Sequence, residues 1–448
     1  MRRRAAAILL ALCMALTLLP TAAFATEEGI APAPVEQPAR QEEKQEGQPE
    51  QQPKETPEQP EQPEEQPEAK PEEQPEQQQE SAAQGELAVQ SNETGIALLA
   101  GHTHCICGGS VTAGDHTSHS DVAYTAWNDT DGISYTNNTA CVYLTANATI
   151  SGHLTVDGKT LYLCLNGKTL SSNGTAKIQV KNGGRLVLCD CQGGGTVKGA
   201  TSGWGGMCVY LYNSRLDMFG GKLTGGKVTG SGGGGAIAMD DQQCIFNMYG
   251  GEISGNNGKN YGGAIFRKFN ANMPNTTGGA FNMYGGVIKN NSAKNGGAFF
   301  STTGGTINMT GGTISGNKAT QSDNNAGGGA IYMRGSGTIN ISGSAQITGN
   351  SSSLDGGAIL MGWGAINISG SVKINNNTAS RWGGAICLRQ DSNQVTTLTM
   401  RGGEISGNKA NSEGGAVHVL DKDCQFFLYD GKITGNTSGD GGAIYLNQ

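Results

Sequence analysis

Four of the six histidines in this chain lie within one short stretch that also contains two cysteines. The members of this group are His102, His104, Cys105, Cys107, His116 and His119. Imidazole and thiolate groups are ligands that zinc prefers, although the His-Thr-His-Cys-Ile-Cys spacing crowds them more than a standard zinc finger does. Two interpretations stay open: a structural zinc that stabilises an N-terminal cap, and a polar, solvated cap without metal. We expect no other cofactor.

Few residues offer acid–base chemistry. Asp240 and Asp241 are the only adjacent acidic pair in the repeats described below, and Arg267 follows them one repeat later. Enzymes that cleave polysaccharides need titratable groups that converge on one bond. Asp240, Asp241 and Arg267 are therefore the candidate catalytic residues, and the alternative is a pair of solvated loop carboxylates.

Aromatic residues recur at two positions of the repeat, and aromatic rings can stack on sugars. One set comprises Phe219, Tyr249, Tyr284 and Tyr429, and the other comprises Phe266, Phe300, Tyr332 and Tyr445. We expect both sets to point outward. The candidate carbohydrate-binding residues are therefore Tyr249, Tyr284, Tyr429, Phe266, Tyr332 and Tyr445. The alternative is that these rings only favour β-structure, in which aromatic residues are enriched.

These residues belong to a repeating chain. A Gly-Gly-Ala word recurs at intervals of 27 to 34 residues, beginning at Gly234, Gly262, Gly296, Gly328, Gly356, Gly383, Gly414 and Gly441. Between the copies lies a second word that ends in asparagine, at Asn256, Asn317, Asn350, Asn377, Asn408 and Asn436. A fixed period in this range is typical of a chain that stacks one structural unit many times.

Each repeat also contains a segment with period-two alternation, such as Phe246-Asn-Met248-Tyr, which predicts a strand with one buried and one exposed face. A glycine pair, a short strand and a Gly-Asn turn follow, and Gly-Gly-Ala begins a third strand. We therefore predict an all-β fold, a right-handed parallel β-helix of about eleven coils over residues 141–448.

Two roles are predicted for the asparagines. In stacked coils the outward residues Asn247, Asn282, Asn308, Asn340 and Asn367 would form one column, whose amides bond from coil to coil as a ladder. The turn asparagines would instead adopt the left-handed conformation that β-branched residues avoid.

Cysteines recur at about one coil length, at Cys141, Cys164, Cys189 and Cys208. We interpret them as an inward column of small hydrophobic residues, and the alternative is disulfide pairing. A Cys-Asp-Cys segment at 189–191 is weak evidence for redox activity by itself.

The N-terminal residues differ from the repeats. Residues 1–25 are typical of a secretory signal cleaved after Ala25, and their apolar run is shorter than the roughly 20 residues that span a membrane. Residues 26–90, rich in Glu, Gln and Pro, predict a disordered linker, and residues 91–140 form the cap region. We expect an extracellular protein, secreted or attached to the cell surface, with no transmembrane segment after signal removal.

Charge and chain ends complete the prediction. Residues 87–448 carry 23 basic and 20 acidic side chains without a basic block, so we expect no nucleic-acid partner. The chain stops inside a repeat at Gln448, whereas a solenoid needs a polar terminal cap. We therefore expect that the C-terminus is truncated or that a partner covers it.

The alternation of Gly-Gly-Ala-Ile with a word ending in Asn resembles the repeats of chlamydial polymorphic membrane proteins. It is similar also to secreted right-handed β-helix proteins of Clostridia-type bacteria, with a pectin-lyase-like fold, and the resemblance covers about residues 100–448. It implies an exported β-helix protein that acts without catalysis, as an adhesin or display rod that binds glycans or a host surface. The alternative is a polysaccharide lyase or glycoside hydrolase that acts on polyuronates.

Overall fold

The computed structural model describes residues 102–105, 121–128, 132–241, 243–268, 279–302, 304–322, 326–390 and 394–447. The chain divides into two units, Met1–Ser91 and Asn92–Gln448, and all described residues belong to the second. The predicted signal peptide, its cleavage site at Ala25 and the Glu/Gln/Pro segment therefore lie outside the described residues.

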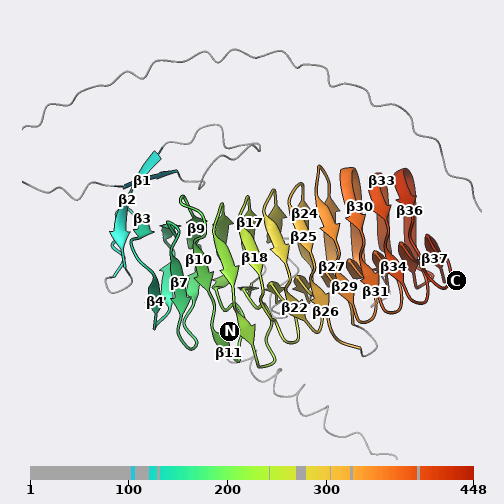
Figure 1. Cartoon of the computed structure of the whole chain (residues 1–448), viewed down its shortest axis with the longest axis horizontal. Helices are drawn as coiled ribbons and strands as arrows, with labels where there is room; N and C mark the ends of the chain where they lie inside the picture. The colour runs from blue at the N-terminus through green and yellow to red at the C-terminus, as the bar shows by residue number, and fades with distance from the viewer. Residues whose placement is uncertain are drawn as a thin grey trace, which may run out of the picture. The chain divides into compact units, whose positions relative to one another are not determined.

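The described residues form β-strands and no helix, and the strands stack in parallel as a right-handed β-helix (Figure 1). Each full coil adds a strand to three columns, which we number 1 to 3. Column 1 begins with three strands of the early coils: β5 (Leu154–Asp157), β8 (Ile178–Lys181) and β12 (Val209–Tyr212). It continues with the strands that follow the Gly-Gly-Ala turns: β16 (Ile237–Met239), β19 (Ile265–Arg267), β23 (Phe299–Ser301), β27 (Ile331–Ile341), β30 (Ile359–Asn375), β32 (Ile386–Leu388), β35 (Val417–Val419) and β37 (Ile444–Leu446).

Column 2 contains the strands with period-two alternation: β2 (Asp121–Trp127), β3 (Thr139–Leu144), β6 (Thr160–Cys164), β9 (Arg185–Cys189), β13 (Arg215–Met218), β17 (Ile245–Met248), β20 (Ala280–Met283), β24 (Gly305–Met309), β33 (Thr396–Ser406) and β36 (Cys424–Thr434). The long strands β27 and β30 cross from column 1 into column 2 and complete it. One further strand, β1 (His102–Cys105), pairs antiparallel with β2.

Column 3 begins with four strands of the early coils: β4 (Ala148–Ile150), β7 (Thr169–Ser172), β10 (Thr196–Lys198) and β14 (Lys222–Thr224). It continues with the strands that precede the Asn turns, β18 (Glu252–Ser254), β21 (Val287–Lys289), β25 (Thr313–Ser315) and β28 (Gln346–Thr348), and with the last residues of β30, β33 and β36. Two-residue strands follow the turns: β11 (Thr201–Ser202), β15 (Lys227–Val228), β22 (Ser292–Ala293), β26 (Lys318–Ala319), β29 (Ser351–Ser352), β31 (Thr378–Ala379) and β34 (Lys409–Ala410).

The predicted fold class is confirmed. Among the described residues, column 1 stacks the eleven strands named above, so that about ten turns of the chain separate its first strand from its last. The count agrees with the prediction of about eleven coils, because the sequence period sets the coil length directly.

The glycine pair of each repeat has two separate tasks, illustrated by Gly356 and Gly357. Gly356 has a φ of +60°, a conformation that glycine adopts without steric cost. A Cβ atom on Gly357 would overlap the carbonyl oxygen of Gly384 in the next coil. The first glycine therefore makes the turn, and the second allows neighbouring coils to approach closely.

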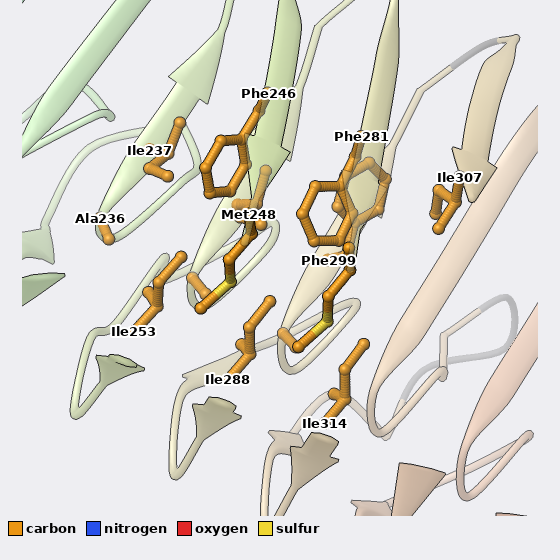
Figure 2. Close-up of a cluster of buried hydrophobic side chains, with 14 of the residues drawn as sticks. Ala236, Ile237, Phe246, Met248, Ile253, Phe281, Ile288, Phe299, Ile307 and Ile314 are labelled. Atoms are coloured by element: carbon orange, nitrogen blue, oxygen red, sulfur yellow. The ribbon is translucent and has the colours of Figure 1, made fainter. Parts of the chain in front are cut away.

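The core fills the space between the columns with one side chain from each inward position (Figure 2). The rings of Phe246 and Phe281 stack with centroids 5.1 Å apart, and Phe281 stacks on Phe299 at 5.7 Å. Complete burial of such a side chain stabilises the fold by about 1.5–3 kcal/mol. The predicted alternation is confirmed here, since Phe246 and Met248 are fully buried.

The outward asparagine ladder is also confirmed. Each amide nitrogen donates to the side-chain oxygen of the preceding coil, at 2.7 Å from Asn282 to Asn247 and 2.8 Å from Asn308 to Asn282. The ladder continues to Asn340 and Asn367 at 2.9 Å. Its first member, Asn247, donates to the buried carboxylate of Asp217 at 2.7 Å.

The predicted role of the turn asparagines is wrong. The left-handed residue is the one before them, Gly349 in one turn and Asn376 in the next. Asn350 and Asn377 instead point inward, where Asn350 Nδ2 donates to Asn377 Oδ1 at 3.0 Å. These buried residues form an inner ladder, which also bonds the turn backbone, because each turn leaves peptide groups that no strand partner satisfies.

The cysteine prediction holds only in part. Cys208 is inward and buried in the main core, as expected. Cys141, Cys164 and Cys189 instead lie on the outer side of column 2, in a separate cluster with Tyr124 and Cys191. The reason is the strand period, because Leu161 and Leu163 of β6 occupy the inward positions and Cys164 follows on the opposite face.

Candidate functional site

A groove of about 410 Å³ opens on the outer side of column 1 at its N-terminal end. The side chains that shape it include His153, Lys177, Gln179, Trp204, Tyr210 and Asp240. A second hollow of about 400 Å³ shares Trp204 and Lys268 with the first and extends to Tyr261 and Phe266. The two hollows therefore meet at Trp204 and Lys268, and we call them together the Trp204 groove.

The stacking of coils brings these residues together from distant parts of the chain. Gln179 of β8 and Tyr210 of β12 are direct neighbours in the register of column 1. Asp240 and Lys268 each follow the last residue of the next two strands, β16 and β19. Trp204 comes from the turn after β11 and is 44% exposed.

Asp240 is the centre of the polar contacts in the Trp204 groove. The hydroxyl of Tyr210 donates to Asp240 Oδ2 at 2.6 Å, and Lys268 Nζ lies 3.3 Å from Asp240 Oδ1. Burial and the hydrogen bond to Asp240 raise the pKa of Tyr210. Lys268 Nζ also lies 4.8 Å from the centroid of the Trp204 ring, within cation–π range. Both carboxylate oxygens therefore hold neighbouring side chains in place.

The groove also contains a buried ammonium group. Lys177 is only 7% exposed, and its Nζ donates to the carbonyl oxygen of Gly205 at 3.1 Å. Burial lowers the pKa of Lys177, because the charged form loses hydration. With His153 and Lys268 against the single carboxylate of Asp240, basic side chains predominate in the lining.

The three candidate catalytic residues do not converge. Asp240 lines the groove, but Asp241 is buried and its Oδ1 accepts the N–H of Gln243 at 2.9 Å, which fixes the following turn. Arg267 occupies the same register position as the inward Met239, and its Nη1 donates to the carbonyl oxygen of Gly304 at 3.2 Å. Strand alternation therefore places Arg267 on the opposite face from Asp240.

The first aromatic set forms a stacked ladder. The ring of Tyr249 lies 4.5 Å from that of Phe219 and 4.9 Å from that of Tyr284, with interplanar angles of 6° and 10°. Each inner ring covers its neighbour's face, so the ladder presents mainly ring edges to solvent. Tyr429 stands in the same column, is 65% exposed and packs against the Arg401 guanidinium at 4.5 Å.

The predicted exposure of the second aromatic set is wrong for Phe266, Phe300 and Tyr332, which are 5%, 1% and 2% exposed. These three form a second apolar cluster, against which Tyr261 and Trp382 pack. Tyr261 and Trp382 directly precede Gly-Gly turns, so these turns fold over the outer face of column 1 and cover it. Tyr445 is half-buried and stacks on His418 at 5.3 Å.

Among the groove residues that sequence reasoning missed are His153, Lys177, Gln179, Trp204 and Tyr210. Only Gln179 and Tyr210 carried a usable signal, because each alternates with two buried neighbours in its strand and is thereby marked as outward. The others lie outside the strand cores of irregular early coils, where no repeat indicates which side they face.

The structure does not describe the side chains of the predicted metal ligands. His102, His104 and Cys105 lie on β1, whose side chains are not described, and Cys107, His116 and His119 lie outside the described residues. Within the residues that are described, no group of His, Cys, Asp and Glu has the arrangement of a metal site. The zinc site of the cap stays a prediction.

Comparison with known proteins gives one match. The family model of the Chlamydia polymorphic membrane protein repeat matches residues 371–389, which span one Asn turn and one Gly-Gly-Ala turn. This match confirms the resemblance to that repeat over part of one coil. No curated protein and no solved structure matches the chain. In the part of the chain that the structure describes, no helix is long and apolar enough to cross a membrane.

Proposed function

We propose that this chain is a surface-displayed β-helix protein that binds carbohydrate without cleaving it, and that the Trp204 groove is the binding site. The observation that carries the proposal is Trp204, a large exposed ring at the junction of two hollows. The repeat match supports display at a surface, since the matched family is named for membrane proteins. Adhesion to glycans or a host surface and an extracellular location follow from this function.

The chemistry of the groove suits a sugar ligand. Carbohydrates bind through apolar ring faces stacked on aromatic side chains and through hydroxyl groups that bond to polar ones. Trp204 offers the ring, while Gln179 and Asp240 offer polar atoms along column 1. The stacked ladder of Tyr249 and Tyr284 is the less favourable platform, because its rings cover one another.

A direct test is the affinity of the full-length chain for a panel of glycans, compared between wild type and Trp204→Ala. We expect about a tenfold loss of affinity, which corresponds to about 1.4 kcal/mol. Tyr284→Ala is the matched control, because Tyr284 is also an exposed ring, at 40%, but belongs to the ladder. Loss of binding in Tyr284→Ala alone would move the site to the ladder, and equal binding by all three proteins would reject the aromatic mechanism.

A second candidate function rests on Lys177. A buried lysine with a lowered pKa can act as a general base, and Tyr210 lines the same groove as a potential proton donor. This pair suits β-elimination in a polyuronate, in which a base removes the proton next to the carboxylate. The test is the ultraviolet absorbance of unsaturated products after incubation with pectin or alginate. Product formation that Lys177→Met abolishes would favour a lyase over a non-catalytic binding protein.

A further inference from the structure

The cysteine cluster on the outer side of column 2 brings three thiols from two coils together. Cys164 and Cys189 are direct partners in the register of β6 and β9. Cys191, two residues after β9 ends, turns back so that its Sγ lies 3.5 Å from Cys164 Sγ. Cys141 and Tyr124 belong to the same cluster, and the Tyr124 hydroxyl lies 3.9 Å from Cys189 Sγ.

The turn that carries Cys191 is held in place by its neighbours. Asp190 is buried, and its Oδ1 and Oδ2 accept the N–H groups of Gly167 and Gly195 at 2.7 and 2.6 Å. Cys191 Sγ donates to Asn166 Oδ1 at 3.5 Å, and Asn166 Nδ2 donates to the carbonyl oxygen of Leu144 at 3.0 Å. The approach of Cys191 to Cys164 is therefore fixed by hydrogen bonds from three successive coils.

We infer that Cys164 and Cys191 form a thiol–disulfide exchange pair, which closes to an intramolecular disulfide when the protein meets a low-molecular-weight disulfide. The cysteines of the main core, such as Cys208, have no such neighbour at this distance among the described residues. Cys189 also bonds to Cys164, but it is fully buried and the Tyr124 hydroxyl lies 3.9 Å from its Sγ, whereas Cys191 is partly exposed to an incoming disulfide.

The electrostatics of the cluster support this pairing. The hydrogen bond from Cys189 lowers the pKa of Cys164 to about 6, although burial opposes the shift, and Cys191 contributes in the same direction. Burial and the neighbouring Cys164 raise the pKa of Cys191 to about 12. The pair therefore shares one proton near neutral pH, and a thiolate is available for exchange.

The reaction balances without a further reagent. In the resting pair the proton lies on Cys191 and the thiolate on the buried Cys164. The incoming disulfide meets the partly exposed Cys191, whose proton passes to the Cys164 thiolate as Cys191 Sγ attacks and releases one small thiolate. That thiolate takes the proton from Cys164, whose sulfur then attacks Cys191 Sγ and releases the second small thiolate, which is protonated by water. Two protein thiols are oxidised, and one small disulfide is reduced to two thiols.

The test is a peptide map of the full-length protein after incubation with oxidised glutathione and alkylation under denaturing, non-reducing conditions. We expect a cross-linked peptide containing Cys164 and Cys191, lighter by two hydrogen atoms than its reduced components. Cys141→Ser is the matched control, because Cys141 is a half-buried member of the same cluster, and it should keep the cross-link. Circular dichroism of each variant checks that the β-helix is intact.

The outcomes separate cleanly. Cys191→Ser should lose the cross-link and leave Cys164 open to alkylation once the chain is denatured. Alkylation of both Cys164 and Cys191 in the wild type after this treatment would overturn the inference. A cross-link from Cys164 to Cys189 or Cys141 instead would overturn it as well, since the exchange partner would then be wrong.

Discussion

Replacement of Asn350 by alanine should open the β-helix locally, because this side chain holds three coils together from inside. Its Oδ1 accepts the backbone N–H and the side-chain amide of Asn317, both at 3.0 Å. Its Nδ2 donates to the carbonyl oxygens of Ile314 and Thr348 at 3.0 and 3.2 Å and to Asn377 Oδ1 at 3.0 Å. The residue is 1% exposed, so water cannot replace these partners.

The magnitude follows from these bonds. The side-chain oxygen of Asn350 accepts two hydrogen bonds, and its amide nitrogen has two N–H groups, which three acceptors share. The side chain therefore makes about four hydrogen bonds, each of which contributes roughly 1 kcal/mol. We therefore expect Asn350→Ala to cost about 4 kcal/mol of local stability, which raises the opening constant of nearby amides about a thousandfold. Asn367→Ala is the control, because this partly exposed ladder residue makes one such bond, to Asn340 at 2.9 Å.

Hydrogen exchange followed by mass spectrometry of peptides around each site is the appropriate assay, since a repeat array need not unfold in one step. For Asn367→Ala we expect about a fivefold loss of protection, equivalent to about 1 kcal/mol. The reasoning is refuted if both variants lose the same protection, or if Asn350→Ala stays within about fivefold of the wild type.

Two further predictions follow from the packing and the charges. Gly357→Ala should lower the free energy of unfolding by about 3 kcal/mol, because its new methyl group meets the backbone of the next coil. Gly152→Ala is the control, since open space surrounds it and the change should stay below about 0.5 kcal/mol. Chemical denaturation measures both values. Burial raises the pKa of Glu252, but Ser254, Lys289 and Lys222 outweigh it and lower the pKa to about 2. A carboxyl group whose pKa is lower in the folded than in the unfolded chain stabilises the fold at pH values above its unfolded pKa. This stabilisation is lost as the pH falls toward the folded pKa, so the free energy of unfolding should decline between about pH 4.5 and pH 2. Glu252→Gln should flatten that decline in acid titrations followed by circular dichroism, and an unchanged profile would contradict the assignment.

The sequence by itself determined the fold. Every regular repeat contains a Gly-Gly turn and strands with period-two alternation, and the repeats follow at a period near thirty residues. The local sequence of each coil therefore specifies its own strands and turns. The outward ladder from Asn247 to Asn367 was predictable for the same reason, because identical positions of stacked coils must lie in one column. Local rules decide such features, and repetition makes them visible.

The tertiary structure alone decided what the outer face does. Whether Phe266 is exposed depends on the turn that carries Tyr261, and neither alternation nor propensity indicates where that turn folds. The choice of Asn350 over Gly349 as the inward residue depends on which peptide groups the turn leaves unbonded.

The candidate site is the feature of this protein that the sequence predicts least. His153 and Asp240 line one groove although 87 residues separate them, because three coils of unequal length bring them into the same region of column 1. Trp204 belongs to an irregular turn that no other coil repeats. The sequence period predicts the columns, because all coils share one register. A groove forms where the coils differ in length and sequence, and only the stacked structure shows which of these irregular residues lie next to one another.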